Sequence, residues 1–295
     1  MRTIACALLL LACLSAHAQV AVELLLDQSQ FLRDESVMVK VRIINRSGQT
    51  LTLGDDANWL TFHVQNRNSR SVVQRSDPAV EGSFELESAS AATRRVDLVP
   101  HFALSQLGRY TVSARVRIKG WGQEIVSASK EFDIIPGLKV WEQEVGVPNN
   151  AGPPEVRKYS LQQATCLKQL TLYARVTDNK DDQIFRVQPL GPLVSFAKPE
   201  AQVDKNSNLH VVFQSGARSF YYVVVSPYGD VMLRQTHEFS GNSRPTLRAT
   251  EDGGFSVSGG FRRRSPTDLP PALPEPPPDP ASPPPAADNA SVAKP

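Results

Sequence analysis

Strict alternation between apolar and polar residues is the feature that most limits how this 295-residue chain can fold. Val37, Val39, Val41 and Ile43 are separated by single residues, and Lys40 lies between two of them. Because successive side chains of a β-strand point to opposite faces, this period of two predicts a strand with one buried and one solvated face. The pattern returns along the chain up to Gly137, so we expect antiparallel sheets that pack one face on a core.

The alternation predicts about seven strands between residues 19 and 137, a stretch of ordinary length for one domain. Turn-forming Asn, Asp, Ser and Gly residues separate these strands. The expected strands cover residues 20–26, 36–45, 50–53, 59–64, 94–98, 109–118 and 125–134. Short strands at this spacing predict a β-sandwich.

One short segment resembles part of a known fold. Residues 107–112, Leu-Gly-Arg-Tyr-Thr-Val, look like the corner that opens the penultimate strand of an immunoglobulin-like sandwich, where a Tyr hydroxyl bonds to nearby backbone. The opening of the chain, with Phe31-Leu32 before a strand that ends in Asn45, is similar to that of bacterial extracytoplasmic immunoglobulin-like domains. The resemblance implies this fold for residues 19–137, without the paired cysteines of antibody domains.

An internal repeat runs through residues 138–264. Residues 173–186 align without gaps with residues 221–234, a shift of 48, and a second correspondence, at a shift of 46, places Leu209 on Phe255. All of the repeat consists of strand and tight-turn signals, so it predicts a second, antiparallel β-domain. The fold class expected for the whole chain is therefore all-β, with an N-terminal immunoglobulin-like sandwich followed by a repeat-built domain.

The repeat length resembles that of β-propeller blades. Two full units and one truncated unit are present, whereas propellers typically close with four or more blades. We therefore expect one of three outcomes for residues 138–264. They form a compact sandwich or half-open barrel, or an open pair of blades covered by the first domain, or such a pair covered by a second chain.

The two ends of the chain differ from these domains. Residues 1–18 have a basic start, an apolar run and the triplet Ala16-His17-Ala18, which together predict a secretory signal cleaved after Ala18 and a secreted or periplasmic product. An alternative is a lipoprotein anchored at Cys13. Residues 265–295 hold twelve of the 23 prolines, so we expect a disordered, Pro-rich tail that cannot bury a core.

Composition excludes several classes of protein. With 32 basic and 30 acidic residues, the net charge of +2 gives no bulk attraction for nucleic acid, and we expect no nucleic-acid partner. No apolar stretch after the signal reaches about 18 residues, so we expect no transmembrane span. Two of the three cysteines lie in the signal, which leaves Cys166 to act as a small buried hydrophobe.

The sequence offers few motifs for catalysis. The histidines lack metal-ligand spacing, and the chain has no nucleophile elbow and no phosphate-binding loop, so we expect no metal or cofactor and no catalytic residue. The acidic run at residues 178–182 is interpreted as a turn rather than a calcium loop, because it lacks the Gly and the distal Glu. The residues proposed for ligand binding are those at matching repeat positions, together with one strand histidine and one tryptophan between glycines. They are Tyr173, Tyr221, Arg186, Arg234, His210 and Trp121.

These features favour a non-enzymatic binding or structural protein of the cell envelope, acting on an unknown protein or glycan through the surfaces of its β-domains. Two alternatives stay open. The first is a glycan-active hydrolase with carboxylates on distant loops, and the second is an assembly subunit whose repeat domain is completed by a partner chain.

Overall fold

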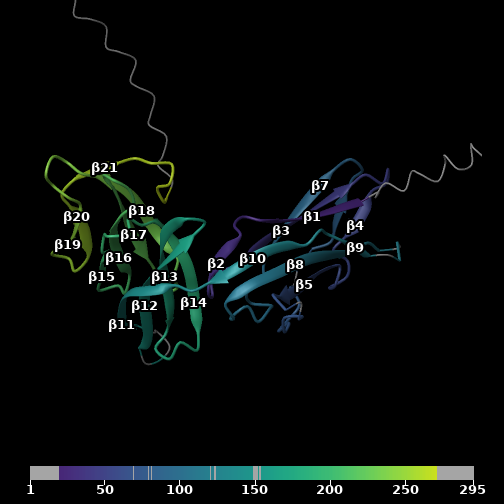
Figure 1. Ribbon diagram of the computed structural model, residues 1–295, viewed down its shortest axis with the longest axis horizontal. Helices are drawn as coiled ribbons and strands as arrows, with labels where there is room; N and C mark the ends of the chain where they lie inside the picture. The colour runs from purple at the N-terminus through teal and green to yellow at the C-terminus, as the bar shows by residue number, and fades with distance from the viewer. Residues whose placement is uncertain are drawn as a thin grey trace, which may run out of the picture.

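The computed structural model describes residues 20–270, apart from residues 69, 79, 81, 120, 123, 149–151 and 153. The predicted signal and most of the Pro-rich tail lie outside the described residues. Every regular element within them is a β-strand, which confirms the all-β prediction. Figure 1 shows two β-bodies side by side along the long axis of the molecule, joined where β10 (Lys130–Ile135) leads into β11 (Leu138–Val147).

The first body is a sandwich of two sheets. One sheet has the order β1-β3-β7, and the other has the order β2-β10-β8-β5 with β9 beside β8. The strands are β1 (Val20–Leu26), β2 (Gln30–Leu32), β3 (Met38–Asn45), β5 (Leu60–Asn66), β7 (Ala91–Asp97), β8 (Gly108–Arg117) and β9 (Glu124–Val126), with a small separate pair, β4 (Leu51–Leu53) and β6 (Phe84–Leu86).

The predicted alternation builds the core of this sandwich. Val39, Val41 and Ile43 on β3 are fully buried, and so are Val112 and Val116 on β8 in the facing sheet. Their partners on the opposite faces remain partly or fully exposed. The structure differs from the expected strands in two details: the stretch 125–134 is divided into β9 and β10, and the short strands β2 and β6 are additional.

The strand order is that of an immunoglobulin-like sandwich, in which the first strand switches sheets so that its second part, β2, pairs in parallel with β10. The predicted corner is present. The Tyr110 hydroxyl donates a 2.8 Å hydrogen bond to the carbonyl oxygen of Gln106. The ring of Tyr110 stacks on Phe132, so the corner ties the loop before β8 to the core.

The second body consists of two antiparallel sheets and a hairpin. The first sheet has the order β11-β12-β13-β14, the second has the order β15-β16-β17-β18-β21, and β19 pairs with β20. The strands are β12 (Glu155–Cys166), β13 (Gln169–Asp178), β14 (Ile184–Pro192), β15 (Glu200–Val203), β16 (Leu209–Gln214), β17 (Ser219–Val225), β18 (Val231–Glu238), β19 (Thr246–Ala249), β20 (Phe255–Ser258) and β21 (Phe261–Arg263).

The two sheets of the second body have the same orientation relative to the layer that precedes each of them. Tyr173 on β13 faces the first body, where it packs with Leu32. Tyr221 on β17, its counterpart in the next repeat unit, faces the preceding sheet and packs beside Phe213. The opposite face of the second sheet carries Tyr222 and is covered by the β19–β20 hairpin. Each repeat unit therefore turns the same side toward the layer before it, as successive propeller blades do.

The truncated third unit is the hairpin itself. Ala201 pairs with Val211 between β15 and β16, and Leu247 pairs with Val257 between β19 and β20. Both residues of the second pair follow those of the first at a shift of 46. The sequence correspondence at that shift therefore reflects an identical strand register.

Six residues of the predicted disordered tail belong to the folded body. After β21 the chain turns at Ser265 and returns along β18, where Leu269 forms a bridge with Arg234. The Asp268 side chain is buried and accepts hydrogen bonds from the backbone N–H and the hydroxyl of Thr236. The folded body therefore extends past the predicted boundary at residue 265. The polar, proline-rich composition of this segment does not reveal that Asp268 is buried against the edge of β18.

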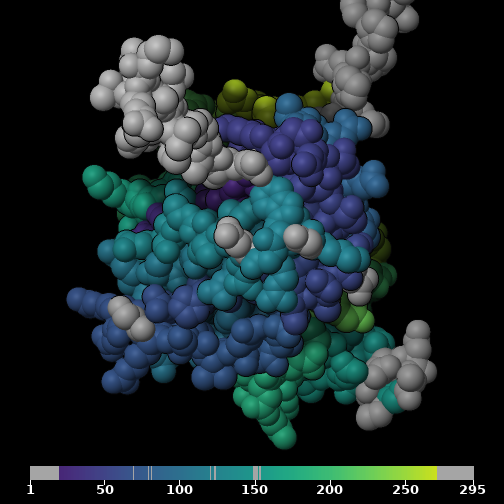
Figure 2. All heavy atoms as spheres, turned by 90° about the vertical axis from the view of Figure 1, so that its right-hand side faces the viewer, coloured from purple at the N-terminus to yellow at the C-terminus, as the bar shows by residue number. Residues whose placement is uncertain are grey.

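Buried contacts hold the two bodies together. Leu32 from the first body is fully buried against Ala164, Tyr173 and Val187 of the second. The side-chain oxygen of Gln30 accepts a 2.8 Å hydrogen bond from the backbone N–H of Leu167. Seen along the long axis, the first body covers most of the second, whose green and yellow atoms emerge only at the margins (Figure 2).

Candidate ligand-binding cleft

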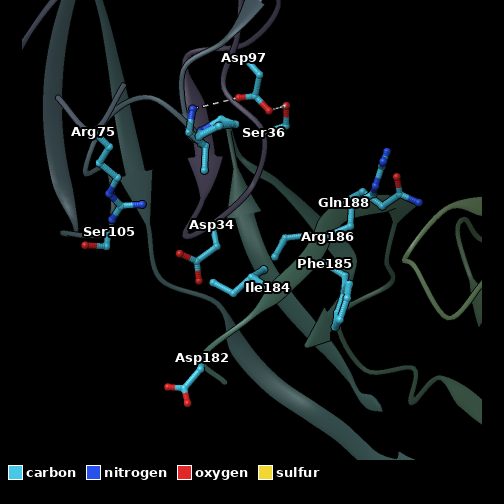
Figure 3. A pocket seen from close by; sticks show the side chains of 13 residues that line it. Asp34, Ser36, Arg75, Asp97, Ser105, Asp182, Ile184, Phe185, Arg186 and Gln188 are labelled. Atoms are coloured by element: carbon cyan, nitrogen blue, oxygen red, sulfur yellow. Dashed lines mark hydrogen bonds between the residues drawn. The ribbon is translucent and has the colours of Figure 1, made fainter. Parts of the chain in front are cut away.

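A cleft of about 650 Å³ lies where the two bodies meet, beside their apolar contact. Figure 3 shows its side chains, which come from loops of the first body and from the start of β14 in the second. The lining residues are Asp34, Ser36, Arg75, Asp97, Val99, Pro100, Ser105, Asp182, Ile184, Phe185, Arg186, Val187 and Gln188. Polar groups dominate the list, so the cleft suits a ligand that forms hydrogen bonds.

The wall from the first body is ordered around Asp97. Its carboxylate accepts hydrogen bonds from the Ser36 hydroxyl at 2.6 Å and the Val99 N–H at 3.1 Å (Figure 3). It also accepts one from the Val37 N–H at 3.1 Å. These bonds fix the two loops of the first body that contain Ser36 and Val99. Arg75 lies on the same wall, is exposed, and has no ion-pair partner among the described residues.

The opposite wall is the edge of a sheet. Five consecutive residues, 184–188, line the cleft. Since side chains alternate along a strand, a run of consecutive residues lines a cavity only where the cavity meets the strand edge-on. Within the part of the chain that the structure describes, β14 is the last strand of its sheet and pairs only with β13.

The β14 edge is irregular at both ends. Ladder register shifts leave Phe185 and Leu190 without a partner on β13, which makes each a β-bulge. Pro189 and Pro192 follow, and proline blocks pairing because it has no N–H. Residues 186–188, between the bulge at Phe185 and Pro189, pair with β13 in regular register.

A network of charges adjoins the cleft at Asp34. Arg175 on β13 lies 3.5 Å from Asp34 of the first body and 2.7 Å from Asp181 in the β13–β14 turn. Burial raises the pKa of Asp181, but hydrogen bonds from Lys158, Arg175 and Thr177 outweigh it and lower that pKa to about 2. The acidic run predicted to be a turn is a turn, and Asp181 serves to tie β12 to β13.

Gln188 contributes an unused donor. Its side-chain nitrogen Nε2 is buried and has no hydrogen-bond partner among the described residues. A buried N–H without an acceptor carries a desolvation penalty, so such groups usually await a ligand or water. Val187 packs against the first body, so the side chain of the next residue, Gln188, lies on the opposite face of β14 and its buried nitrogen is not presented to the cleft.

The residues predicted to bind ligand are not gathered in one place. Arg186 lines the cleft, and its guanidinium pairs with Asp230 of the next meander at 3.2 Å. Tyr173 is buried in the contact between the two bodies, where its hydroxyl lies 3.0 Å from the Cys166 sulfur. Burial strongly raises the pKa of Tyr173. Tyr221 lies between the two sheets, against Gly191 and Phe213.

The gapless alignment of Arg186 with Arg234 is wrong in structural terms. Arg175 pairs with Val187, whereas Val223, the counterpart of Arg175 in the next repeat unit, pairs with Arg234. The counterpart of Arg234 is therefore Val187. The difference arises in the turns. The segment between the paired residues Thr177 and Ile184 is one residue longer than the segment between the paired residues Val225 and Val231.

His210 belongs to a buried network beneath the hairpin. Its Nε2 lies 3.0 Å from Asp204, and its Nδ1 lies 2.7 Å from the Tyr222 hydroxyl, which donates to the carbonyl oxygen of Phe255 at 3.0 Å. Burial raises the pKa of Asp204, but hydrogen bonds from His210 and Asn208 outweigh burial and leave that pKa lowered.

This network holds β20 against the second sheet. His210, Tyr222 and the neighbouring His237 are all buried, so the arrangement is closed to a substrate and acts in packing. Burial lowers the pKa of His237, and Arg262 adds to that shift against the opposing effect of Asp268. The Nε2 atom of His237 has no partner among the described residues.

Trp121 lies in the turn between β8 and β9, which Figure 1 places at the end of the first body away from the cleft. It is partly buried against the core of that body. Sequence reasoning did not identify Arg75, Asp97 or Gln188 as site residues. No local pattern marks them, because the cleft forms only when the two bodies dock.

Over the described parts of the chain, no set of three or more His, Cys, Asp or Glu side chains is placed to hold a metal ion. Nor does that part of the chain contain a helix of the length and apolarity needed to cross a membrane.

No protein-family model matches this sequence, and no curated protein matches it. Among solved structures, the sporulation control protein Spo0M from Bacillus subtilis is similar over 54% of this chain and 80% of its own, with 10% sequence identity and a TM-score of 0.29. A likeness at that TM-score bears on neither fold nor function.

Proposed function

We propose that this chain is a secreted or cell-envelope binding protein without enzymatic activity, and that it holds a protein or glycan partner in the cleft between its two β-domains. The observation that carries this proposal is that residues of both β-domains form the walls of the cleft. Leu32 and the Asp34–Arg175 ion pair fix its walls. Yet, among the described residues, the exposed Arg75 guanidinium of the cleft has no ion-pair partner.

The amino-terminal signal and the resemblance to bacterial extracytoplasmic domains support the proposed location. Immunoglobulin-like sandwiches serve many functions, so the fold itself does not specify the activity. The exposed, unpaired Arg75 guanidinium in the cleft supports a role in binding.

The state of the cleft carboxylates argues against the hydrolase alternative. Hydrolysis of a glycosidic bond ordinarily needs two carboxyl groups that face the substrate. Asp97 accepts three hydrogen bonds from its own wall, and Asp34 is paired with Arg175. Asp182 is the one cleft carboxylate without a partner among the described residues.

The alternative of an assembly subunit is also less well supported. The outer face of the second sheet, where a further repeat would stack, is covered by the chain's own β19–β20 hairpin. The edge of β18 is covered by β21 and Leu269.

Photo-crosslinking tests the proposal. A benzophenone amino acid is introduced at Arg75 in the full chain and expressed in the source cells, with Arg46 as the matched control. Arg46 also lies in a loop of the first body, but it does not line the cleft. We expect a discrete adduct from position 75 only, whose mass identifies a protein or a glycan. Adducts equal at both positions, or none at position 75, would refute the proposed cleft.

A further inference from the structure

We propose that the turns at one end of the second body attach this protein to a membrane that contains anionic lipid. The surface consists of four turns, which we call the basic end, and they comprise residues 167–168, 193–199, 215–218 and 239–245. It is separate from the cleft, so this inference goes beyond the proposed function and does not depend on it.

The four turns of the basic end are neighbours in space. Each joins strands of the second body at the same end of the two sheets. Three backbone hydrogen bonds connect one turn to the next, directly or through a strand residue beside it: Leu193 N–H to the Leu170 carbonyl oxygen at 2.8 Å, Val194 N–H to the Gln214 carbonyl oxygen at 3.0 Å, and Phe239 N–H to the Arg218 carbonyl oxygen at 3.2 Å. Side chains that protrude from these turns therefore share one surface.

Two large apolar side chains protrude from the basic end. Phe196 is 85% exposed, the highest value for a large apolar residue among those described, and Leu167 is 66% exposed. They lie on separate turns, whereas the core of a protein–protein interface is a continuous, closely packed apolar patch. A lipid interface accepts isolated apolar tips one by one, and aromatic side chains are enriched there. The two tips therefore fit a bilayer better than the surface of a protein.

The charge of the basic end specifies the lipid. Its four turns contain no Asp or Glu, but they contain Lys168, Lys198, Arg218 and Arg244. Arg244 is paired with Glu200 at 3.2 Å, while the other three are exposed and have no ion-pair partner in the described parts of the chain. Each basic residue near an anionic membrane strengthens binding about fivefold. Arg218 also lines a pocket of about 390 Å³, which is large enough for a lipid headgroup.

Attachment through the basic end leaves the cleft open. Residues 184–188, at the start of β14, line the cleft. Pro192, the last residue of the same strand, pairs with Thr171 beside the β12–β13 turn. The two surfaces lie at opposite ends of β14, so a chain held on a membrane can still present the cleft to a partner.

The first test measures co-sedimentation with vesicles of phosphatidylcholine alone or with about one-third phosphatidylglycerol. The chain used begins at Gln19, because the apolar run of the predicted signal would itself bind lipid. We expect binding to the anionic vesicles to be tighter by about tenfold or more and to weaken as salt is added. Phe196→Ala should weaken that binding about tenfold, since it removes an apolar side chain from the lipid. The matched control is Tyr228→Ala, at an exposed aromatic residue in the turn at the other end of β17, and it should bind as the wild type does.

The second test concerns the charges. The double variant Lys168→Gln, Lys198→Gln should bind anionic vesicles about tenfold or more weakly and leave binding to neutral vesicles unchanged. The control, Lys180→Gln with Lys205→Gln, removes the same charge from exposed turns at the other end of the two sheets, so we expect it to bind normally. All these substitutions are on exposed turns and should leave the fold intact.

The third test distinguishes insertion into lipid from adsorption by charge. Tryptophan is introduced by Phe196→Trp or, as the control, by Tyr228→Trp, and its fluorescence is measured with vesicles of brominated lipid. Bromine should quench the tryptophan at position 196 and spare the one at position 228. Equal binding to neutral and anionic vesicles, equal losses in the two lysine variants, or no quenching at position 196 would overturn the proposal. Binding to soluble polyglutamate as tight as to anionic vesicles would also overturn it, because it would assign the basic end to an acidic protein.

Discussion

The Arg175 guanidinium lies 3.5 Å from the Asp34 carboxylate, and this ion pair crosses from one β-domain to the other. Both side chains are mostly shielded, each being 17% exposed. Arg175 also donates to Asp181, so it joins the domain contact to the turn that precedes β14. The position of the cleft wall thus depends on one arginine.

Replacing this arginine should destabilise the protein. Arg175→Gln removes a charge from a largely shielded network. It leaves Asp34 without its ion-pair partner and Asp181 with two of its three donors, so we expect the free energy of unfolding in urea to fall by about 1–3 kcal/mol. The matched control is Arg42→Gln, which removes an exposed pair with Glu23 and should change stability by less than about 1 kcal/mol. Equal effects for the two variants would show that the domain contact does not depend on Arg175.

The immunoglobulin-like corner gives a second prediction. Tyr110→Phe keeps the ring that stacks on Phe132 but removes the hydrogen bond to Gln106, so we expect a loss of about 0.5–1.5 kcal/mol in the free energy of unfolding. Tyr228→Phe, at an exposed tyrosine, is the control and should be nearly neutral. A neutral Tyr110→Phe would mean that packing alone holds the corner.

The network beneath the hairpin gives a third prediction. Tyr222→Phe removes its bond to the carbonyl oxygen of Phe255 and its contact with His210. We expect amide hydrogen exchange in β19 and β20 to become about tenfold faster, with the first sandwich unchanged. In the control Tyr221→Phe, the hydroxyl removed has one long contact of 3.4 Å to Thr267, and exchange in the hairpin should stay as in the wild type.

The pH dependence of stability should report on His237. Burial lowers the pKa of this histidine in the folded state, so the unfolded chain binds its proton first as the pH falls. Stability from this group is complete above the unfolded pKa of about 6.5 and is lost as the pH falls below that value. Urea titrations between pH 8 and pH 5 should show a smaller decline for His237→Phe than for the wild type. An identical decline would contradict a neutral, buried His237.

Processing of the amino terminus tests the proposed location. Intact-mass measurement of the protein recovered from the envelope of the source cells should give a chain that begins at Gln19, and Cys13→Ser should leave that mass unchanged. A lipid-modified chain that begins at Cys13 would instead establish the lipoprotein alternative.

Local patterns in the sequence predicted the strands well. The alternation around Val39 and Val112 specified strand position and buried face, because a period of two has a direct meaning in a sheet. The residues around Tyr110 predicted the corner. The correspondence at a shift of 46 predicted a repeat unit, and the structure shows the same strand register in β15–β16 and β19–β20.

Features that depend on docking or on hairpin length escaped prediction. Arg186 and Arg234 align in sequence, but one additional turn residue in the first hairpin makes Val187 the structural counterpart of Arg234. Arg75, Asp97 and Gln188 come from segments far apart along the chain, and only the contact between the two bodies brings them to one cleft. Six residues assigned to the tail carry a buried aspartate whose binding site, the edge of β18, does not exist until the sheet has formed.

The hairpin of β19 and β20 also determines where the stack of sheets stops. Leu247 and Val257 face the sheet before them, while Arg248, Ser256 and Ser258 on the other side are exposed. A complete third blade would repeat the apolar outer face of the second sheet and so recruit a fourth. The hairpin instead acts as a capping unit. It covers the apolar face of the second sheet and presents a polar surface to solvent, so no further sheet stacks on it.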